Sequence, residues 1–290
     1  MNTKINEAEE ILLDCTLCPR HCHVDRTAGE TGFCKTGDQA FVSSWGPHFG
    51  EERPLVGRQG SGTIFFGNCN LGCLFCQNYS ISHGGEGTEI SDEQLAGVML
   101  GLQHTGCHNI NFVTPTHQVA AILRSLKMSM EKGLSIPLVY NCGGYESLQT
   151  LGILNGIIDI YMPDFKYSGS EYAARFSGAD DYPDVAKHAL KEMHRQVGDL
   201  VMDERGIAQR GLLVRHLVLP DSVAGTAEVV RFIAEELSKD TYVNIMDQYH
   251  PCFKAFENPP LDRGITGREY ADAVQMAINA GLSRIDGVTV

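Results

Sequence analysis

Residues 69–76 read Cys69-Asn70-Leu71-Gly72-Cys73-Leu74-Phe75-Cys76, which puts three cysteines in one short loop. Cysteine thiolates bind the irons of iron–sulfur clusters, and a 4Fe-4S cluster has four irons to fill. A loop that supplies three thiolates therefore leaves one iron open to a substrate or cofactor. The alternatives are ordinary buried cysteines and part of a zinc site, but a zinc site needs a fourth ligand.

The loop follows the apolar run 62–67, the first of six short, β-rich runs that alternate with longer helix-compatible stretches. This alternation predicts parallel βα units. No glycine-rich dinucleotide fingerprint follows the first run, so we expect an α/β fold with a partial (β/α)6 TIM-like barrel over residues 58–290. A doubly wound sheet is the alternative. The expected strands are 62–67, 109–114, 136–141, 157–162, 212–219 and 241–246, and the expected helices are 91–105, 117–132, 145–154, 182–202, 224–238 and one that begins at Thr266.

Two of these helices begin with the spacing of a capping box. Ser91 stands three residues before Gln94, and Thr266 stands three residues before Glu269. In this arrangement each side chain bonds to the backbone N–H of the other residue, which satisfies donors at the helix start. We therefore expect helices to start directly after Ser91 and Thr266.

The N-terminal extension, residues 1–57, has little periodic hydrophobicity and carries a second group of cysteines: Cys15, Cys18, Cys22 and Cys34. Four soft ligands in a short span suit a tetrahedral zinc ion and a second 4Fe-4S cluster alike, and spacing alone does not separate the two. We expect a small Cys-rich, metal-binding segment stabilised by its metal. Glu51 and Glu52 are expected to be solvated linker charges, with substrate contact as the alternative.

Bulk properties disfavour several classes of protein. The chain has 290 residues, of which 43% are hydrophobic, enough for a sizeable core. Its net charge of −13 makes nucleic acid or a membrane surface an unfavourable main partner. We find no apolar run of membrane length and no signal-peptide pattern, and we expect a cytoplasmic protein. Seven of the ten cysteines fall into the two groups, which favours metal ligation over disulfides.

Polar side chains recur where the expected strands end. The carboxyl ends of parallel strands meet at one rim of a barrel, so the cysteine loop and these side chains should share that rim. The side chains concerned are Thr114, Thr116, His117, Asn141, Asp164, Lys166, Arg215 and His250. Since no serine triad, P-loop or basic aromatic surface stands out, the rim is the predicted functional site.

The cysteine loop resembles the signature of the radical S-adenosylmethionine (SAM) superfamily, including the aromatic Phe75 before its last cysteine. Further stretches make almost the whole chain similar to the radical SAM proteins named as pyruvate formate-lyase activating enzyme homologues: residues 15–22 (CTLCPRHC), 29–34 (GETGFC), 60–66 (GSGTIFF) and 76–79 (CQNY). The resemblance implies a 4Fe-4S cluster on Cys69, Cys73 and Cys76. It further implies reductive cleavage of SAM to a 5′-deoxyadenosyl radical that abstracts a hydrogen atom.

The resemblance also implies roles for residues at the rim. Asp164-Phe165-Lys166 is similar to the D-x-K motif of the activating enzymes, and Arg215 and His250 stand where that family has an arginine and a histidine on later strands. Lys166 and Arg215 would contact the SAM carboxylate or a substrate anion. A monovalent cation would bind to Asn141, Met162 and Asp164. The remaining SAM contacts would come from Phe75, Asn78, Thr114, Thr116 and His117.

The implied partners are a reductant such as flavodoxin or ferredoxin and a protein or peptide substrate, for example a glycyl radical protein. The substrate itself does not follow from the family. Radical chemistry on a small metabolite is one alternative, and an iron–sulfur electron-transfer protein is another. Residues 84–86 (Gly-Gly-Glu) match the superfamily's SAM-binding tripeptide in letters only; they precede the first expected helix, and we expect a surface turn there.

Overall fold

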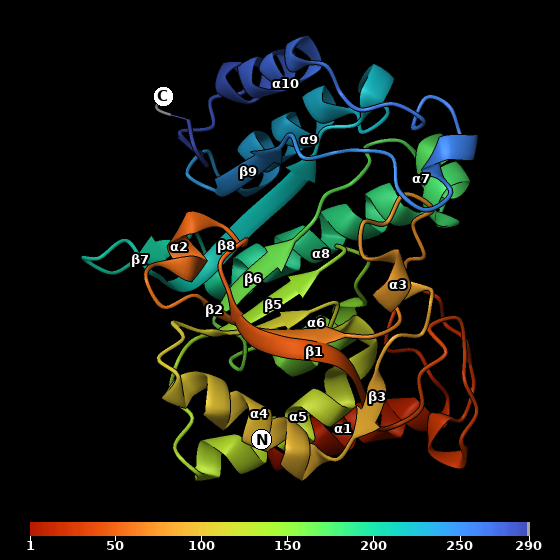
Figure 1. Cartoon of the computed structure of the whole chain (residues 1–290), viewed down its shortest axis with the longest axis vertical. Helices are drawn as coiled ribbons and strands as arrows, with labels where there is room; N and C mark the ends of the chain where they lie inside the picture. The colour runs from red at the N-terminus through yellow and green to blue at the C-terminus, as the bar shows by residue number, and fades with distance from the viewer. Residues whose placement is uncertain (289–290) are drawn as a thin grey trace.

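The computed structural model describes residues 1–288 and has an α/β architecture built on one mostly parallel sheet (Figure 1). The strand order is β10-β9-β8-β6-β5-β4-β2-β1-β3, with β7 paired to β8 off this path. The α/β class is confirmed, but the sheet is open in the described part of the chain, since β3 and β10 end it on opposite sides. The strands are β1 (Ala40–His48), β2 (Ser61–Phe66), β3 (Thr88–Ile90), β4 (Ile110–Val113), β5 (Leu138–Cys142), β6 (Ile160–Pro163), β7 (Val201–Met202), β8 (Ala208–Leu217), β9 (Tyr242–Met246) and β10 (Arg284–Ile285).

All six predicted strands are present, as β2, β4, β5, β6, β8 and β9, and neighbouring members of this set run parallel. Their apolar runs are buried because helices cover the sheet, as expected of parallel strands. The register aligns Phe65 with Val113 and Val113 with Asn141. Residues that follow neighbouring strands therefore lie side by side at one edge.

Helices pack on the outside of the sheet, with α1, α4 and α5 grouped at one end and α9 and α10 at the other (Figure 1). Both predicted capping boxes are confirmed, at the starts of α4 and α10. The helices are α1 (Asn2–Leu13), α2 (Arg53–Val56), α3 (Tyr79–Ser82), α4 (Asp92–His104), α5 (Val119–Glu131), α6 (Leu148–Leu154), α7 (Ser170–Ser177), α8 (Tyr182–Val197), α9 (Thr226–Phe232) and α10 (Gly267–Asn279), with short 3-10 or π turns at η1 (Arg26–Ala28), η2 (Thr116–Gln118), η3 (Pro220–Ser222), η4 (Ile233–Leu237) and η5 (Ala255–Glu257).

Two predicted helices differ from the structure at their C-terminal ends. The predicted helix 182–202 is too long, because Gly198 leaves the helical region (φ 70°, ψ −163°) and the chain continues into β7. The predicted helix 224–238 is α-helical only to Phe232 and continues as the wider π turn η4. Gly198 can end the first of these helices because glycine adopts a positive φ at little cost.

The N-terminal extension shares its core with the rest of the chain. Helix α1, which we did not predict, buries Ile5, Ala8 and Leu12 in the same apolar cluster as the strands and helices that follow. Strand β1, also not predicted, pairs antiparallel with β2 and β3. The boundary expected at residue 57 therefore does not separate two hydrophobic cores. Between residues 1 and 288 we find no helix with both the length and the apolar character needed to cross a membrane.

Candidate functional site

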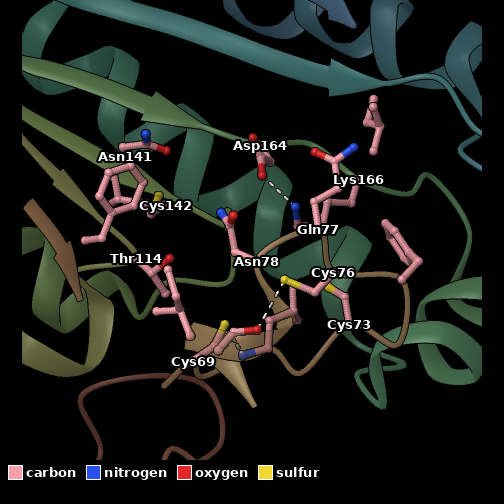
Figure 2. A pocket seen from close by; sticks show the side chains of 18 of the residues that line it. Cys69, Cys73, Cys76, Gln77, Asn78, Thr114, Asn141, Cys142, Asp164 and Lys166 are labelled. Atoms are coloured by element: carbon pink, nitrogen blue, oxygen red, sulfur yellow. Dashed lines mark hydrogen bonds and ion pairs between the residues drawn. The ribbon is translucent and has the colours of Figure 1, made fainter. Parts of the chain in front are cut away.

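A cavity of about 240 Å³ lies at the carboxyl ends of the parallel strands. The cysteine loop after β2 supplies one side of it, and Asn141 and Asp164 lie on the opposite side (Figure 2). Every one of the six predicted strands sends a residue at or after its end into the lining, as the rule for barrel rims predicts. The polar and cysteine residues among the lining side chains are Asn68, Cys69, Cys73, Cys76, Gln77, Asn78, Ser82, His83, Thr114, Asn141, Cys142, Asp164, Lys166, Arg215 and Gln248.

The three cysteines of the loop all line this cavity, and each sulfur has a hydrogen-bond donor of its own. Gly72, with a φ of 77°, gives the loop its tight turn between the first two cysteines. The donors are Leu71 N to Cys69 Sγ at 3.3 Å, Ser177 Oγ to Cys73 Sγ at 3.0 Å and Ser82 Oγ to Cys76 Sγ at 3.2 Å. A donor at each sulfur stabilises the thiolate form that binds metal.

Burial disfavours ionisation of two of the loop thiols, Cys73 and Cys69. Burial raises the pKa of Cys73 to about 12, against the opposing effect of the Lys166 ammonium, and it also raises the pKa of Cys69. A bound metal cation favours the thiolate over the thiol, so metal binding releases the thiol protons. Cys69 and Cys73 would therefore lose their protons when a cation binds.

Asp164, Lys166 and Arg215 form an ion-pair network on the opposite wall. Lys166 Nζ donates to Asp164 Oδ2 at 2.5 Å, and Arg215 Nε donates to Asp164 Oδ1 at 2.8 Å. Arg215 also donates to Asn141 Oδ1 at 2.7 Å, and its guanidinium lies 3.9 Å from the carboxylate of Glu51. The side chains of Asp164, Lys166 and Arg215 keep 14%, 19% and 18% exposure, so this wall is largely shielded from water.

The network fixes the charges of its members. Burial alone would raise the pKa of Asp164, but Arg215 and Lys166 outweigh it, so the pKa of this carboxyl is lowered. Burial would lower the pKa of Lys166, but the Asp164 carboxylate outweighs it and raises the pKa. Asp164 is therefore ionised between two cations, and Lys166 and Arg215 are the groups of this wall that could bind an anionic ligand.

Most predicted site residues reach the cavity, but four do not. Phe75, Asn78, Thr114, Asn141, Asp164, Lys166 and Arg215 line it. Thr116 is buried and donates to Glu146, and Met162 belongs to an apolar cluster inside the sheet. His250 is exposed and contacts Gln77 and the Gln248 carbonyl. His117 is buried beside the other cysteine group.

The positions that we assigned to a monovalent cation have other partners. Asn141 and Asp164 both accept hydrogen bonds from Arg215, so a guanidinium supplies the positive charge between them. Met162 is fully buried in β6, away from the lining. Residues 84–86 are exposed, in line with the surface turn that we expected.

No family model matches the chain. The chain is 32% identical to "Uncharacterized protein MJ0674" of Methanocaldococcus jannaschii over 297 aligned positions, which cover 98% of the chain and 80% of that relative. The chain belongs to the MJ0674 family. A second protein of the same organism, "Uncharacterized protein MJ0808", is 23% identical over 85% of the chain and 73% of its own length.

In this MJ0674 family member, the four N-terminal cysteines also come together. All of them line a second, much smaller cavity with Arg20, Arg26 and His117. Among residues 1–288, no three His, Cys, Asp or Glu side chains converge at the spacing of a single-ion site. A 4Fe-4S cluster binds each thiolate at a different iron and does not need that convergence.

Two residues that complete the site were not predicted: Ser177 and Ser82 bond to the cysteine sulfurs. Cys142 and Gln248 lie in the stretches 141–144 and 247–250, which we expected at the rim, and both line the cavity. Glu51 and Glu52, expected in solvent, are buried, and Glu52 accepts a hydrogen bond from Asn244. No local pattern marks the two serines, because their contacts depend on how distant segments pack.

Proposed function

We propose that this protein is a radical SAM enzyme that holds a 4Fe-4S cluster on Cys69, Cys73 and Cys76. The observation that carries the proposal is the shared cavity: three thiols of one loop face a wall that presents Lys166 and Arg215. When bound, the cluster and SAM would supply a 5′-deoxyadenosyl radical for hydrogen abstraction. The open, mostly parallel sheet supports the finer proposal that the fold is the partial (β/α)6 barrel of that superfamily.

The cysteine loop fits such a cluster by the chemistry of its donor set. Three soft sulfur ligands stand at one side of a cavity, each with a hydrogen-bond donor, and three thiolates leave one iron for a fourth ligand. Phe75 is buried between Tyr167 and Tyr249, with ring centroids 6.2 and 6.1 Å away. This packing holds the loop and keeps water from its inner side.

The opposite wall suits the charges of the amino-acid end of SAM. Lys166 and Arg215 would bind the carboxylate, and Asp164 would keep both cations in place through its two oxygens. Thr114, which follows β4 and lines the cavity, offers a hydroxyl to the ammonium group. Asn78 and Asn141 add amide groups that can donate or accept.

The substrate is a separate part of the proposal. We propose hydrogen abstraction from a protein or peptide, with a flavodoxin or ferredoxin as reductant in the cytoplasm and without nucleic acid or membrane partners. Radical chemistry on a small metabolite is the second candidate. An iron–sulfur electron-transfer protein would need no such polar wall opposite the cysteines.

The decisive experiment is anaerobic reconstitution followed by a single-turnover assay with dithionite and SAM. We expect about four irons on the loop and formation of 5′-deoxyadenosine. Cys73→Ala is the matched variant, and Cys107→Ala, at a buried cysteine outside both groups, is the control. An intact cluster that leaves SAM uncleaved with every reductant tried, and that shows no change in its electron paramagnetic resonance on addition of SAM, contradicts the proposal.

A further inference from the structure

The four N-terminal cysteines surround one small cavity although they span residues 15–34. The cavity measures about 10 Å³, roughly the room that one water molecule needs, and all four cysteines contribute to its lining. Cys15, Cys18 and Cys34 are buried, and Cys22 is half-buried. Phe33 N donates to Cys22 Sγ at 3.3 Å, and Arg26 Nη1 lies 4.0 Å from Cys15 Sγ. The group is therefore a closed cage of sulfurs with positive partners.

A second observation at this cage points to a bound cation. His117 also lines it, is 1% exposed, and has its Nε2 2.9 Å from the Gly67 carbonyl oxygen. A carbonyl oxygen only accepts, so Nε2 carries the proton and Nδ1 has a free lone pair. Nδ1 is buried and has no hydrogen-bond partner in the described structure. A buried lone pair without a partner is costly. A cation held by the four thiolates would offset this cost electrostatically, without His117 as a ligand.

We propose that Cys15, Cys18, Cys22 and Cys34 hold a second metal centre, bound by thiolates and separate from the site at Cys69, Cys73 and Cys76. Four cysteine ligands that close around the metal are typical of structural sites, which leave no position for a substrate. Zinc and iron–sulfur clusters share this ligand chemistry, and the lack of single-ion convergence among residues 1–288 favours the cluster. The proposal does not depend on SAM binding.

The same segment reaches across to the three-cysteine loop through Arg20, which lies between Cys18 and Cys22. Arg20 Nε donates to Asn70 O at 2.9 Å, and Nη2 donates to Leu71 O at 2.8 Å and to Ser177 O at 3.0 Å. Its guanidinium stacks 3.9 Å from the centre of the Phe33 ring. The second metal centre would thus fix the residue that holds the backbone of the three-cysteine loop.

Phe33 adds a direct contact between the two cysteine groups. A methyl group placed on Gly72 would meet the Phe33 ring at 3.0 Å, so ring and loop backbone are in van der Waals contact. Phe33 is the neighbour of Cys34, and Gly72 is the neighbour of Cys73. Loss of metal at the N-terminal group should therefore loosen the three-cysteine loop.

The test uses the 290-residue chain with Cys69, Cys73 and Cys76 replaced by alanine, so that only the N-terminal group can bind a thiophilic metal tightly. This protein is reconstituted anaerobically with iron and sulfide in one batch and with zinc in another, and metal is measured after gel filtration. We expect either about four irons with four sulfides, or about one zinc, to remain per chain. Either result supports the centre and identifies its metal.

Further variants assign the metal to its ligands. Adding Cys18→Ser and Cys34→Ser should remove it, whereas adding Cys107→Ser and Cys252→Ser, outside both groups, should not. A milder variant, Cys22→Ser, covers the case in which the double variant fails to fold: it should release metal to a chelator at least tenfold faster. A folded triple-alanine protein that retains no metal from either batch overturns the proposal, as does metal that persists without Cys18 and Cys34.

Discussion

The two cysteine groups carry the same ligand type but have opposite surroundings. The three-cysteine loop faces a cavity of about 240 Å³ with a charged far wall, whereas the four-cysteine group encloses about 10 Å³. In metal sites, a missing protein ligand marks a centre that accepts a substrate, and a complete set marks a structural centre. On this basis we expect the three-cysteine loop to be the reactive site and the four-cysteine group to be the structural one.

The largest expected effect is on SAM cleavage, which should depend on the three-cysteine loop far more than on the four-cysteine group. Cys73→Ala should reduce 5′-deoxyadenosine formation to the level of a reaction without protein, because the cluster would lose one of its three thiolates. Cys18→Ser with Cys34→Ser should leave measurable turnover in protein that still folds. The assay is chromatography of the nucleoside after a fixed time at saturating SAM. Equal loss in both variants would mean that the two groups do not differ in role.

The next effect concerns the charged wall. Arg215→Lys keeps the charge but loses the planar fork that bonds to Asp164 and Asn141 through separate nitrogens, and hydrogen bonds to charged groups contribute about 1.5–3 kcal/mol. We expect SAM affinity to fall by about 10- to 100-fold, measured by isothermal titration of the reconstituted protein. His250→Ala, at an exposed residue outside the lining, is the control and should change affinity by less than about twofold.

The bracing contact gives a smaller effect, on stability. Arg20→Lys loses the fork that bonds to the carbonyls of Asn70, Leu71 and Ser177. We expect the thermal midpoint to fall by about 2–4 °C, equivalent to about 1 kcal/mol in a chain of this size. Arg195→Lys, at an exposed surface pair with Glu192, should shift it by less than about 1 °C. Equal shifts of the thermal midpoint in the two variants would show that Arg20 does not stabilise the three-cysteine loop.

The strands and their order could be predicted because the sequence patterns that specify them are local. The apolar runs before Cys69, Thr114 and Asp164 are β-rich and continuous, and parallel strands bring their carboxyl ends to one edge whatever the rest of the chain does. The capping boxes at Ser91 and Thr266 depend on residues three positions apart. The same locality explains why most of the predicted lining residues were found.

The remaining contacts could not be predicted because their partners are remote in the chain. Arg20 and Ser177 are 157 positions apart, and no pattern of spacing connects them. Glu51 was wrongly placed in solvent because its charge suggests exposure, yet Arg215 and His48 supply partners that permit burial. Apolar positions at spacings of three and four in α1 gave a usable helical signal, which we overlooked.

The smallest predicted effect compares the buried histidines of the two regions. His216, next to Arg215 in β8, has its Nδ1 2.6 Å from the Phe165 carbonyl and its Nε2 3.0 Å from the Thr226 hydroxyl. Both nitrogens are therefore satisfied in the neutral ring, unlike those of His117. Burial lowers the pKa of His216 to about 4, although the Phe165 carbonyl and Asp164 oppose the shift.

This difference gives His216 a defined pH dependence. The unfolded chain takes up a proton near pH 6.5 and the folded chain only near pH 4, so stability is complete above pH 6.5 and is lost as the pH falls toward 4. Between pH 7.5 and 5.5, His216 should lower the free energy of unfolding by about 1 kcal/mol. His216→Gln, whose side chain stays uncharged throughout this pH range, should remove that share of the fall. The measurement is the urea midpoint of unfolding at each pH. It is made in the protein with Cys69, Cys73 and Cys76 replaced by alanine, because acid would otherwise release the loop cluster and change the stability. His188→Gln, at an exposed position of α8, should leave the fall unchanged, and an unchanged fall in His216→Gln would show that this ring does not titrate on unfolding.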